Sequence, residues 1–348
     1  MRYRAIEYVL PSRKISNEEI LQRVQDESQS HLTAAELKRV LRLLRFAFRA
    51  MGTTVRFGRT EAEHPYQLCT EAGKRALSRA ELDPKQIDLL IYVGVGRGFI
   101  EPATANVFQD HLGLSNATCF DVMDACASWL RATHIARSFI DSGAYRNIMI
   151  LNAEFNANFE NYRICSLDEF DHRFPAFSIG EATTATIVSA SQRDDECVTE
   201  FRTFGDQRDK CLIPLPNCAD YLGTEGDAGG ELEPMQFVSF GRDIMEFGMD
   251  KLIEQYHKDP AFHDYDPDIV FFHAASDGMA RDGMRQCGLD ESIGYYSHHQ
   301  FANTVSATIP LAMAAAAEQG RLLPGMRVIV AMASAGISTG LSRFTYLT

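Results

Sequence analysis

Residues 118–130, TCFDVMDACASWL, decide the fold class of this chain. They predict a strand that runs into a turn, followed by a helix that begins at or after Cys126. A strand joined to a helix by a tight turn is a building unit of α/β folds. The small residues around Cys126 would also let a substrate approach its thiol.

Short apolar runs predict further strands, and because the runs are continuous, we expect these strands to be covered on both faces. The runs are 89–96 (LLIYVGVG), 148–153 (IMILNA), 185–190 (ATIVSA), 269–273 (IVFFH) and 327–333 (RVIVAMA). Helical stretches lie between them, among them 61–80 and 310–320. This alternation of strands and helices predicts an α/β architecture.

A short pattern occurs in both halves of the chain: LDPKQID at 82–88 and YDPDI at 265–269 each lead into a predicted strand. The repeat indicates an internal duplication, with an N-terminal half at 1–190 and a C-terminal half at 191–348. Between them, region 197–234 is rich in Gly, Pro, Asp and Cys and has poor periodicity. We expect an insertion or long loop there.

Composition excludes several classes of protein. The 348 residues include 34 Lys and Arg against 47 Asp and Glu, a net charge of −13, which disfavours a nucleic-acid partner. No apolar stretch reaches the ~18 residues of a membrane span, and the N-terminus lacks the apolar core of a signal peptide. The eight cysteines form no CxxC pair, so we expect no zinc ribbon and a cytoplasmic protein with reduced thiols.

Residues 33–52 predict a well-defined helix, because Thr33 and Glu36 form a capping box ahead of an apolar face. Four cations follow one side of this helix: Lys38, Arg42, Arg45 and Arg49. They fit either a solvated flank or a docking surface for phosphates or an acidic carrier protein, and the sequence leaves both interpretations open.

Three side chains are the candidates for chemistry. A cysteine at a helix N-terminus favours the thiolate, so Cys126 is a candidate nucleophile, although a buried cysteine is more often inert. His273 closes a predicted strand, and Asn303 precedes a small-residue helix, yet each could instead be a structural residue. His298 and His299 are rival bases, but their surroundings predict a loop.

Several segments together resemble the β-ketoacyl-ACP synthase III branch of the thiolase superfamily and, within it, the fatty-acyl condensing enzymes of bacterial olefin synthesis. The resemblance runs from about residue 61 to the C-terminus. The matching segments are 82–92, 101–105 (EPATA), 120–130, 272–273, 302–304, 325–333 and 336–340. It implies a thiolase-like fold of two similar halves in a layered α-β-α-β-α arrangement, and a homodimer.

The resemblance also implies roles. Cys126 matches the acyl-accepting cysteine, while His273 and Asn303 match the residues that stabilise an enolate formed when a malonyl thioester loses carbon dioxide. The backbone N–H groups of Cys126 and of the loop at Ala335 and Gly336 would form an oxyanion hole. Substrates would be acyl-CoA or acyl carrier protein thioesters, and no metal or redox cofactor is implied.

The sequence departs from the family pattern at four places. The Gln after the histidine is Ala274, a nearby Asn is Ser276, the glycine triplet is 333–336 (ASAG), and the GDGAGA turn is 179–184 (IGEATT). Because the Cys–His–Asn set remains, these departures favour a specialised fatty-acid, polyketide or secondary-metabolite pathway over ordinary fatty-acid initiation.

Other activities remain open. Glu101 is either a solvated loop carboxylate or, as in the olefin-type enzymes, a base that reaches the partner subunit's site and permits condensation without decarboxylation. The acyl group could instead pass from Cys126 to an oxygen or nitrogen of a small molecule. A non-catalytic partner subunit is a further alternative, against which the retained Cys126, His273 and Asn303 argue.

Overall fold

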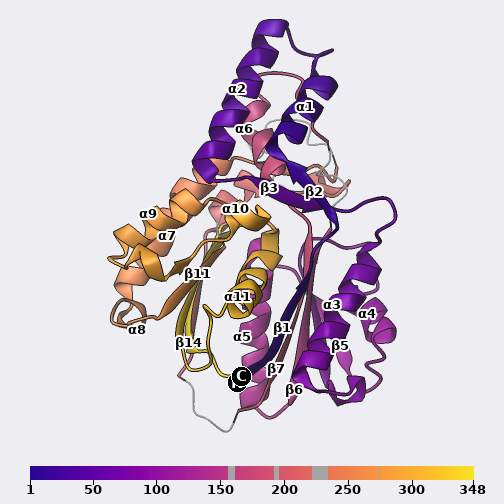
Figure 1. Ribbon diagram of the computed structural model, residues 1–348, viewed down its shortest axis with the longest axis vertical. Coiled ribbons are helices and arrows are strands. Elements are labelled where there is room, and N and C mark those ends of the chain that lie inside the picture. Colours follow the sequence, from indigo (N-terminus) through magenta and orange to yellow (C-terminus); the bar gives the residue numbers. More distant parts are fainter. Residues whose placement is uncertain (156–160, 192–195, 222–233, 274) are drawn as a thin grey trace.

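The computed structural model describes residues 1–155, 161–191, 196–221, 234–273 and 275–348. Two sheets stand side by side, with helices between them and on both outer faces (Figure 1). The predicted α/β class and the five-layered, thiolase-like architecture are confirmed.

The two five-stranded sheets have the same design. The first has the order β1 (Arg2–Val9), β7 (Ala182–Ser189), β6 (Asn147–Glu154), β4 (Leu89–Val93) and β5 (Thr118–Val122). The second has the order β8 (Val198–Thr203), β14 (Ser338–Thr345), β13 (Arg327–Ser334), β11 (Ile269–His273) and β12 (Gly294–Tyr295). In each sheet the first three strands are antiparallel and the last three are parallel.

Helices cover both faces of each sheet, which explains why the central strands read as unbroken apolar runs. The middle layer consists of α5 (Ser128–Asp141) and α11 (Thr308–Glu318). The outer face of the first sheet packs on α3 (Pro65–Ala80) and α4 (Ala105–His111). That of the second packs on α7 (Gly241–Lys258), α8 (Pro260–His263) and α9 (Asp277–Gln286).

A smaller helical part projects beyond the sheets (Figure 1). It contains α1 (Asn17–Ser28), α2 (Ala34–Met51), α6 (Phe170–Arg173) and the antiparallel strand pair β2 (Arg13–Ser16) and β3 (Val55–Gly58). The predicted capping box of Thr33 and Glu36 is present, and α2 ends at Gly52, whose φ of 80° suits glycine. The remaining short elements are β9 (Cys211–Leu212), β10 (Val238–Ser239) and α10 (His298–Phe301).

The repeated Asp-containing pattern has one structural role in both halves. Asp88 precedes β4 and accepts the N–H of Asn147 at the start of β6, at 3.0 Å. Asp268 precedes β11 and accepts the N–H of Arg327 at the start of β13, at 2.7 Å. The predicted boundary at 190/191 lies between the last strand of the first sheet and the first strand of the second. The assignment of two domains stays a prediction.

The expectation of a loop throughout 197–234 is wrong for its first part. Residues Val198–Thr203 form β8, the edge strand beside β14, and β9 pairs with β10. Edge strands are only half covered, so β8 lacks the continuous apolar run that identified the central strands. Residues 222–233 of this region lie outside the described part of the chain.

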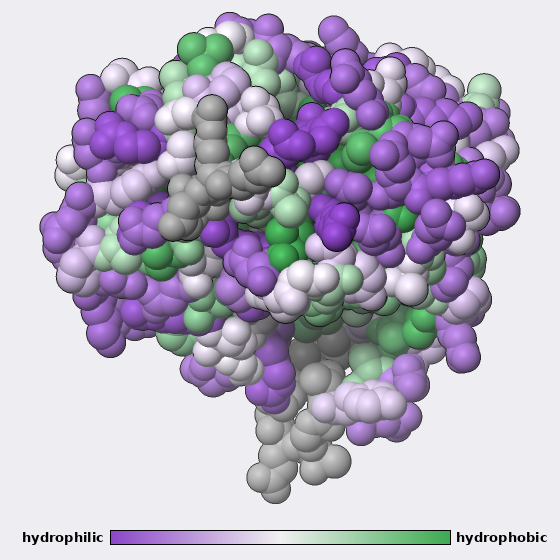
Figure 2. Space-filling view, turned by 90° about the horizontal axis from the view of Figure 1, so that it is seen from below, coloured by the Kyte–Doolittle hydropathy of each residue, from purple (hydrophilic) through white to green (hydrophobic). Residues whose placement is uncertain are grey.

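Both chain ends lie together at the bottom of Figure 1, where Tyr3 N–H donates to the carbonyl of Leu347. Hydrophilic side chains cover most of the face that contains them, with apolar residues in scattered patches (Figure 2). Within the described ranges, no helix has both the length and the apolar character needed to cross a bilayer.

Candidate active site

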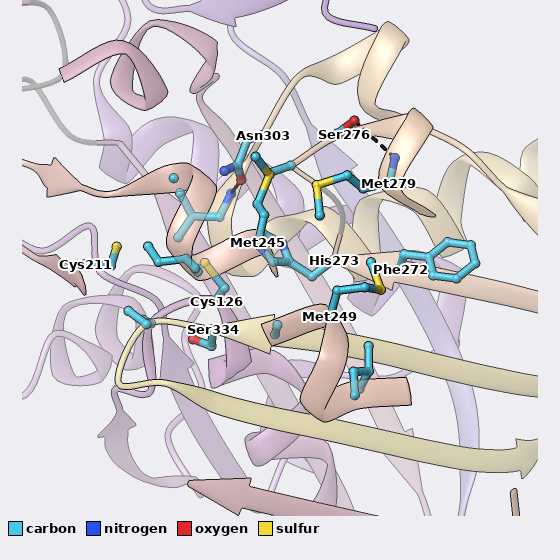
Figure 3. Close-up of a pocket in the computed structure, with 18 of the residues that line it drawn as sticks. Cys126, Cys211, Met245, Met249, Phe272, His273, Ser276, Met279, Asn303 and Ser334 are labelled. Carbon is cyan, nitrogen blue, oxygen red and sulfur yellow. Dashed lines mark hydrogen bonds between the residues drawn. The ribbon is translucent and has the colours of Figure 1, made fainter. Parts of the chain in front are cut away.

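A cavity of about 520 Å³ brings the three predicted chemical residues together. Cys126, His273 and Asn303 all line it, and their side chains converge on one end of it (Figure 3). Cys126 comes from the turn before α5, His273 from the end of β11, and Asn303 from the segment before α11. Residues that are far apart in the sequence, and that come from both halves of the chain, thus line one cavity.

Cys126 lies in a short helical turn, Ala125–Ala127, directly before α5. Ala125 adopts a positive φ of 44°, a strained conformation for a residue other than glycine. Ser128 braces the turn, because its hydroxyl donates to the Ala125 carbonyl at 2.7 Å and accepts the Asp124 N–H at 2.8 Å. The predicted strand–turn–helix is confirmed, with the helix starting two residues after Cys126.

The expected lowering of the thiol pKa by the helix dipole is wrong. Burial raises the pKa of Cys126 well above its usual value, and nearby Cys211 and Glu154 raise it further. Desolvation of the thiolate therefore outweighs the backbone hydrogen bond at Cys126 that lowers the pKa. In the free protein Cys126 is a thiol, and it needs a proton acceptor before it can attack a thioester.

His273 provides a neutral imidazole at the same end of the cavity. Burial lowers the pKa of His273 to about 4, and neighbouring His298 lowers it as well. At pH 7 the ring therefore carries one N–H donor and one acceptor nitrogen. A neutral ring can accept the thiol proton, and it can also donate a hydrogen bond to a carbonyl oxygen.

Asn303 is fixed by its own backbone and amide. Its N–H donates to the Ser178 carbonyl at 3.0 Å, and its carbonyl accepts the Gly180 N–H at 2.9 Å. The side-chain oxygen accepts the Val305 N–H at 2.9 Å, the contact drawn in Figure 3. Since the oxygen is occupied, the amide nitrogen is left to donate toward the cavity.

The loop between β13 and β14 also reaches the cavity. Ala335 and Gly336, the predicted oxyanion-loop residues, both line it. Gly336 has a φ of 127°, where side chains are rarely tolerated, so glycine is required at this point. The ASAG sequence thus keeps the one glycine that its backbone needs.

Two residues at the site escaped sequence reasoning. Ser334 and Glu154 are both almost completely buried, and each contacts an active-site turn. Burial raises the pKa of Glu154 to about 7, although hydrogen bonds from Ser306, Val95 and Gly96 oppose this shift. Glu154 stands in no recognisable motif, and Ser334 lies in the ASAG segment without any sign of its role, because the contacts of both exist only after the two halves pack.

The rest of the cavity is mostly apolar, although Arg208 and a few serines also line it. It extends between α7, α9 and the second sheet, where four methionines line it together with aliphatic and aromatic side chains. Met245 and Met249 of α7 and Met279 of α9 face it across from Phe272 of β11 (Figure 3). Flexible, unbranched methionines adapt to an apolar ligand.

Other predicted residues lie elsewhere. Glu101 is exposed and does not line this cavity. His298 contacts the Thr53 hydroxyl at 2.7 Å and His299 contacts Asp277 at 2.8 Å, and neither lines the cavity. The rival bases are thus outside the site.

The cations Lys38, Arg42, Arg45 and Arg49 are all exposed on α2, whose last residue, Met51, lines the cavity. Of the departures from the family pattern, Ser276 caps α9 by accepting the Met279 N–H at 3.3 Å. Ala274 lies outside the described residues.

Sequence comparison identifies relatives that cover most of the chain. The family model described as 3-oxoacyl-[acyl-carrier-protein] synthase III matches residues 120–206, and the model of the C-terminal part of that enzyme matches residues 260–346. A β-ketoacyl-[acyl-carrier-protein] synthase III of Clostridioides difficile is 24% identical over 81% of this chain and 84% of its own length. The enzyme of the same name from Listeria welshimeri is 27% identical over 80% of this chain and 82% of its own length.

Solved structures share the fold. A 3-oxoacyl-[acyl-carrier-protein] synthase III from Aquifex aeolicus has a TM-score of 0.80 at 19% identity and covers 99% of both chains. Xanthomonas campestris OleA with bound lauric acid and lauroyl-CoA has a TM-score of 0.82 at 17% identity, covering 99% of this chain and 98% of that one.

Proposed function

Because the chain is a β-ketoacyl-ACP synthase III-like enzyme of the thiolase superfamily, we propose that it condenses two acyl thioesters through an acyl-Cys126 intermediate. The observation that carries the proposal is the convergence of Cys126, His273 and Asn303 on one end of an apolar cavity. The N-terminal half, 1–190, would supply the nucleophile, and the C-terminal half, 191–348, the other two residues.

In the first step Cys126 attacks the carbonyl carbon of an acyl thioester. His273 accepts the thiol proton and returns it to the departing thiolate of coenzyme A or of the carrier's phosphopantetheine. The new bond joins sulfur to the acyl carbon, and the bond to the donor sulfur breaks. The backbone N–H groups of Cys126 and of the Ala335–Gly336 loop would hold the oxyanion.

In the second step a malonyl thioester loses carbon dioxide, and the carbon of its enolate attacks the acyl carbon on Cys126. A carbon–carbon bond forms, the bond between the acyl carbon and the Cys126 sulfur breaks, and a β-ketoacyl thioester leaves. The freed Cys126 thiolate takes a proton from solvent. His273 and Asn303 donate hydrogen bonds to the enolate oxygen, where negative charge develops. The neutral state of His273 and the fixed amide of Asn303 support these roles. No cofactor is proposed for either step.

The first substrate is proposed to carry a medium or long acyl chain. A chain bound to Cys126 can extend between α7, α9 and the second sheet, where the cavity of about 520 Å³ is apolar. Each buried methylene contributes about 0.8 kcal/mol, or roughly fourfold in affinity. The lauroyl ligands of the structurally similar OleA agree with such a substrate. A specialised lipid or secondary-metabolite pathway fits this preference.

Two surfaces complete the proposal. The exposed cations of α2 would bind coenzyme A phosphates or an acidic carrier protein, since the stripe is basic in a chain of net charge −13. The exposed segment around Glu101, with Ile100 71% exposed, would contact a second copy of the chain. In the alternative reaction, condensation without decarboxylation, Glu101 of such a homodimer would reach the neighbour's site as the base.

Intact-protein mass spectrometry after incubation with acyl-CoAs of increasing length tests the proposal. We expect one acyl mass on the wild type and on Cys165→Ala, whose cysteine lies away from the cavity, and none on Cys126→Ala. Adding malonyl-CoA should release a β-ketoacyl product and carbon dioxide. Retained labelling and activity in Cys126→Ala would refute the intermediate. Acylation of an alcohol or amine without extender consumption would instead identify a small-molecule acyltransferase.

A further inference from the structure

The two halves of the fold place equivalent turns against each other at the active site. The turn Ala125–Ala127 precedes α5, and the turn Val305–Ala307 precedes α11. Their first residues both adopt a positive φ, 44° at Ala125 and 51° at Val305. A hydroxyl braces each of them in the same way, from Ser128 at 2.7 Å and from Thr308 at 2.9 Å.

The turn of Cys126 is also held from the other half of the chain. Ser334, the last residue of β13, accepts the Ala127 N–H at 3.2 Å. The same hydroxyl donates to the Asp124 carbonyl at 3.2 Å. One side chain therefore bonds the backbone on both sides of Cys126, and a serine hydroxyl can serve as both donor and acceptor.

The turn that follows Asn303 is held in a reciprocal way. Glu154, the last residue of β6, accepts the N–H of Ser306 at 3.3 Å and also its hydroxyl. The same carboxylate accepts the N–H groups of Val95 and Gly96, at 3.3 Å each. Gly94 makes the approach feasible, because a Cβ at that position would lie 2.7 Å from the Glu154 carboxylate.

The strands β6 and β13 occupy the same position in their sheets, third from the antiparallel edge. We infer that Glu154 and Ser334 are positioning residues that act across the two halves. Ser334 sets the turn that carries Cys126, and Glu154 sets the turn that follows Asn303 together with the loop after β4. The assignment of one residue to acylation and the other to condensation rests on the proposed function. The hydrogen bonds that hold the two turns can be tested without assuming that function.

The first experiment measures amide hydrogen exchange by mass spectrometry in the full-length protein. Ser334→Ala should speed exchange in the peptide covering 124–128 by about fivefold or more and leave 303–308 unchanged. Glu154→Gln should do the reverse and also speed exchange at 94–97, because its amide nitrogen cannot accept an N–H. Ser342→Ala is the matched control, as Ser342 is buried on β14 and bonds Thr199 away from the cavity.

The second experiment separates positioning from general support of the fold. Ser334→Ala should change the rate at which iodoacetamide alkylates Cys126 by about fivefold or more, and Ser342→Ala should not. An enzyme already acylated should then condense at least tenfold slower in Glu154→Gln than in Ser342→Ala. If Glu154→Gln does not fold, Ser306→Ala tests the same contact by removing only the hydroxyl.

Equal exchange in both turns for either variant, or alkylation unchanged in Ser334→Ala, would overturn the inference. A wild type that is acylated but consumes no extender would end the proposed condensation. In that case the exchange and alkylation results would still decide whether the two residues act across the halves.

Discussion

The substitution His273→Ala removes the proposed proton acceptor, and we expect it to block acylation of Cys126 at neutral pH. Burial raises the pKa of the Cys126 thiol well above its ordinary value, so the thiol form dominates at pH 7. Burial lowers the pKa of His273 to about 4, so its ring is ready to accept a proton throughout the physiological range. Because the thiol pKa is raised and the imidazole pKa is lowered, Cys126 depends on the His273 ring to accept its proton.

The size of the effect follows from these two groups. A positioned general base typically contributes about 100-fold to 10,000-fold. We therefore expect His273→Ala to slow acylation at least 100-fold at pH 7. The loss should shrink as pH rises, because the variant gains thiolate about tenfold per pH unit until the thiol pKa is reached. In the wild type, His273 itself should remain able to accept the thiol proton until the pH falls toward 4, where the ring becomes protonated.

The assay is rapid-quench mass spectrometry of acyl-Cys126 formation between pH 5 and 9.5. Glu154, whose pKa is raised by burial to about 7, titrates in both proteins, so the ratio of the two rates isolates His273. Iodoacetamide alkylation of Cys126 provides a check that needs no thioester. A variant that acylates within tenfold of the wild type at pH 7, with a flat ratio across the pH range, would refute this account.

Three further predictions concern the second step, the acyl chain and the donor. Asn303→Ala should still form acyl-Cys126 but condense about 100-fold more slowly in a single-turnover assay; a block of acylation with normal condensation of pre-acylated enzyme contradicts its assignment. Met249→Trp should fill part of the cavity and shift the preferred acyl-CoA to shorter chains, losing about fourfold in kcat/KM per methylene excluded, and an unchanged chain-length profile argues against chain binding there. Reversing charge at Arg42 and Arg45 should raise KM for the thioester several-fold at low salt and less at high salt, while Lys74→Glu on α3 should not; equal effects would exclude specific docking at α2.

The sequence was sufficient to predict β4, β6, β7, β11 and β13, because burial on both faces leaves a continuous apolar run. The internal strand β14 was missed although it is buried, because its sequence, STGLSRFT, has no such run. The run 269–273 matches β11 residue for residue, and 327–333 lies within β13. The strands β1 and β8 were missed because they lie at sheet edges and contain many polar residues. Their pairing depends on distant neighbours rather than on local periodicity.

The site shows the same division between local and distant causes. The helix after Cys126 could be predicted from a local pattern, and so could its dipole. The burial that raises the thiol pKa could not, because Cys211 and Glu154 approach Cys126 from distant parts of the chain. Ser334 escaped prediction for the same reason, since both of its contacts with the turn span more than 200 residues.

The duplicated architecture also suggests why the thiol stands in one turn and not in the other. Cys126 and Ser306 are the middle residues of equivalent turns. A thiol at 306 would lie against the Glu154 carboxylate, and a neighbouring negative charge disfavours thiolate formation. The turn of Cys126 is held instead by Ser334, a neutral hydroxyl that fixes the backbone without adding charge of its own, although Glu154 still raises the pKa of Cys126. The asymmetry between Glu154 and Ser334 therefore favours nucleophile chemistry in the first half and leaves the second half to orient Asn303.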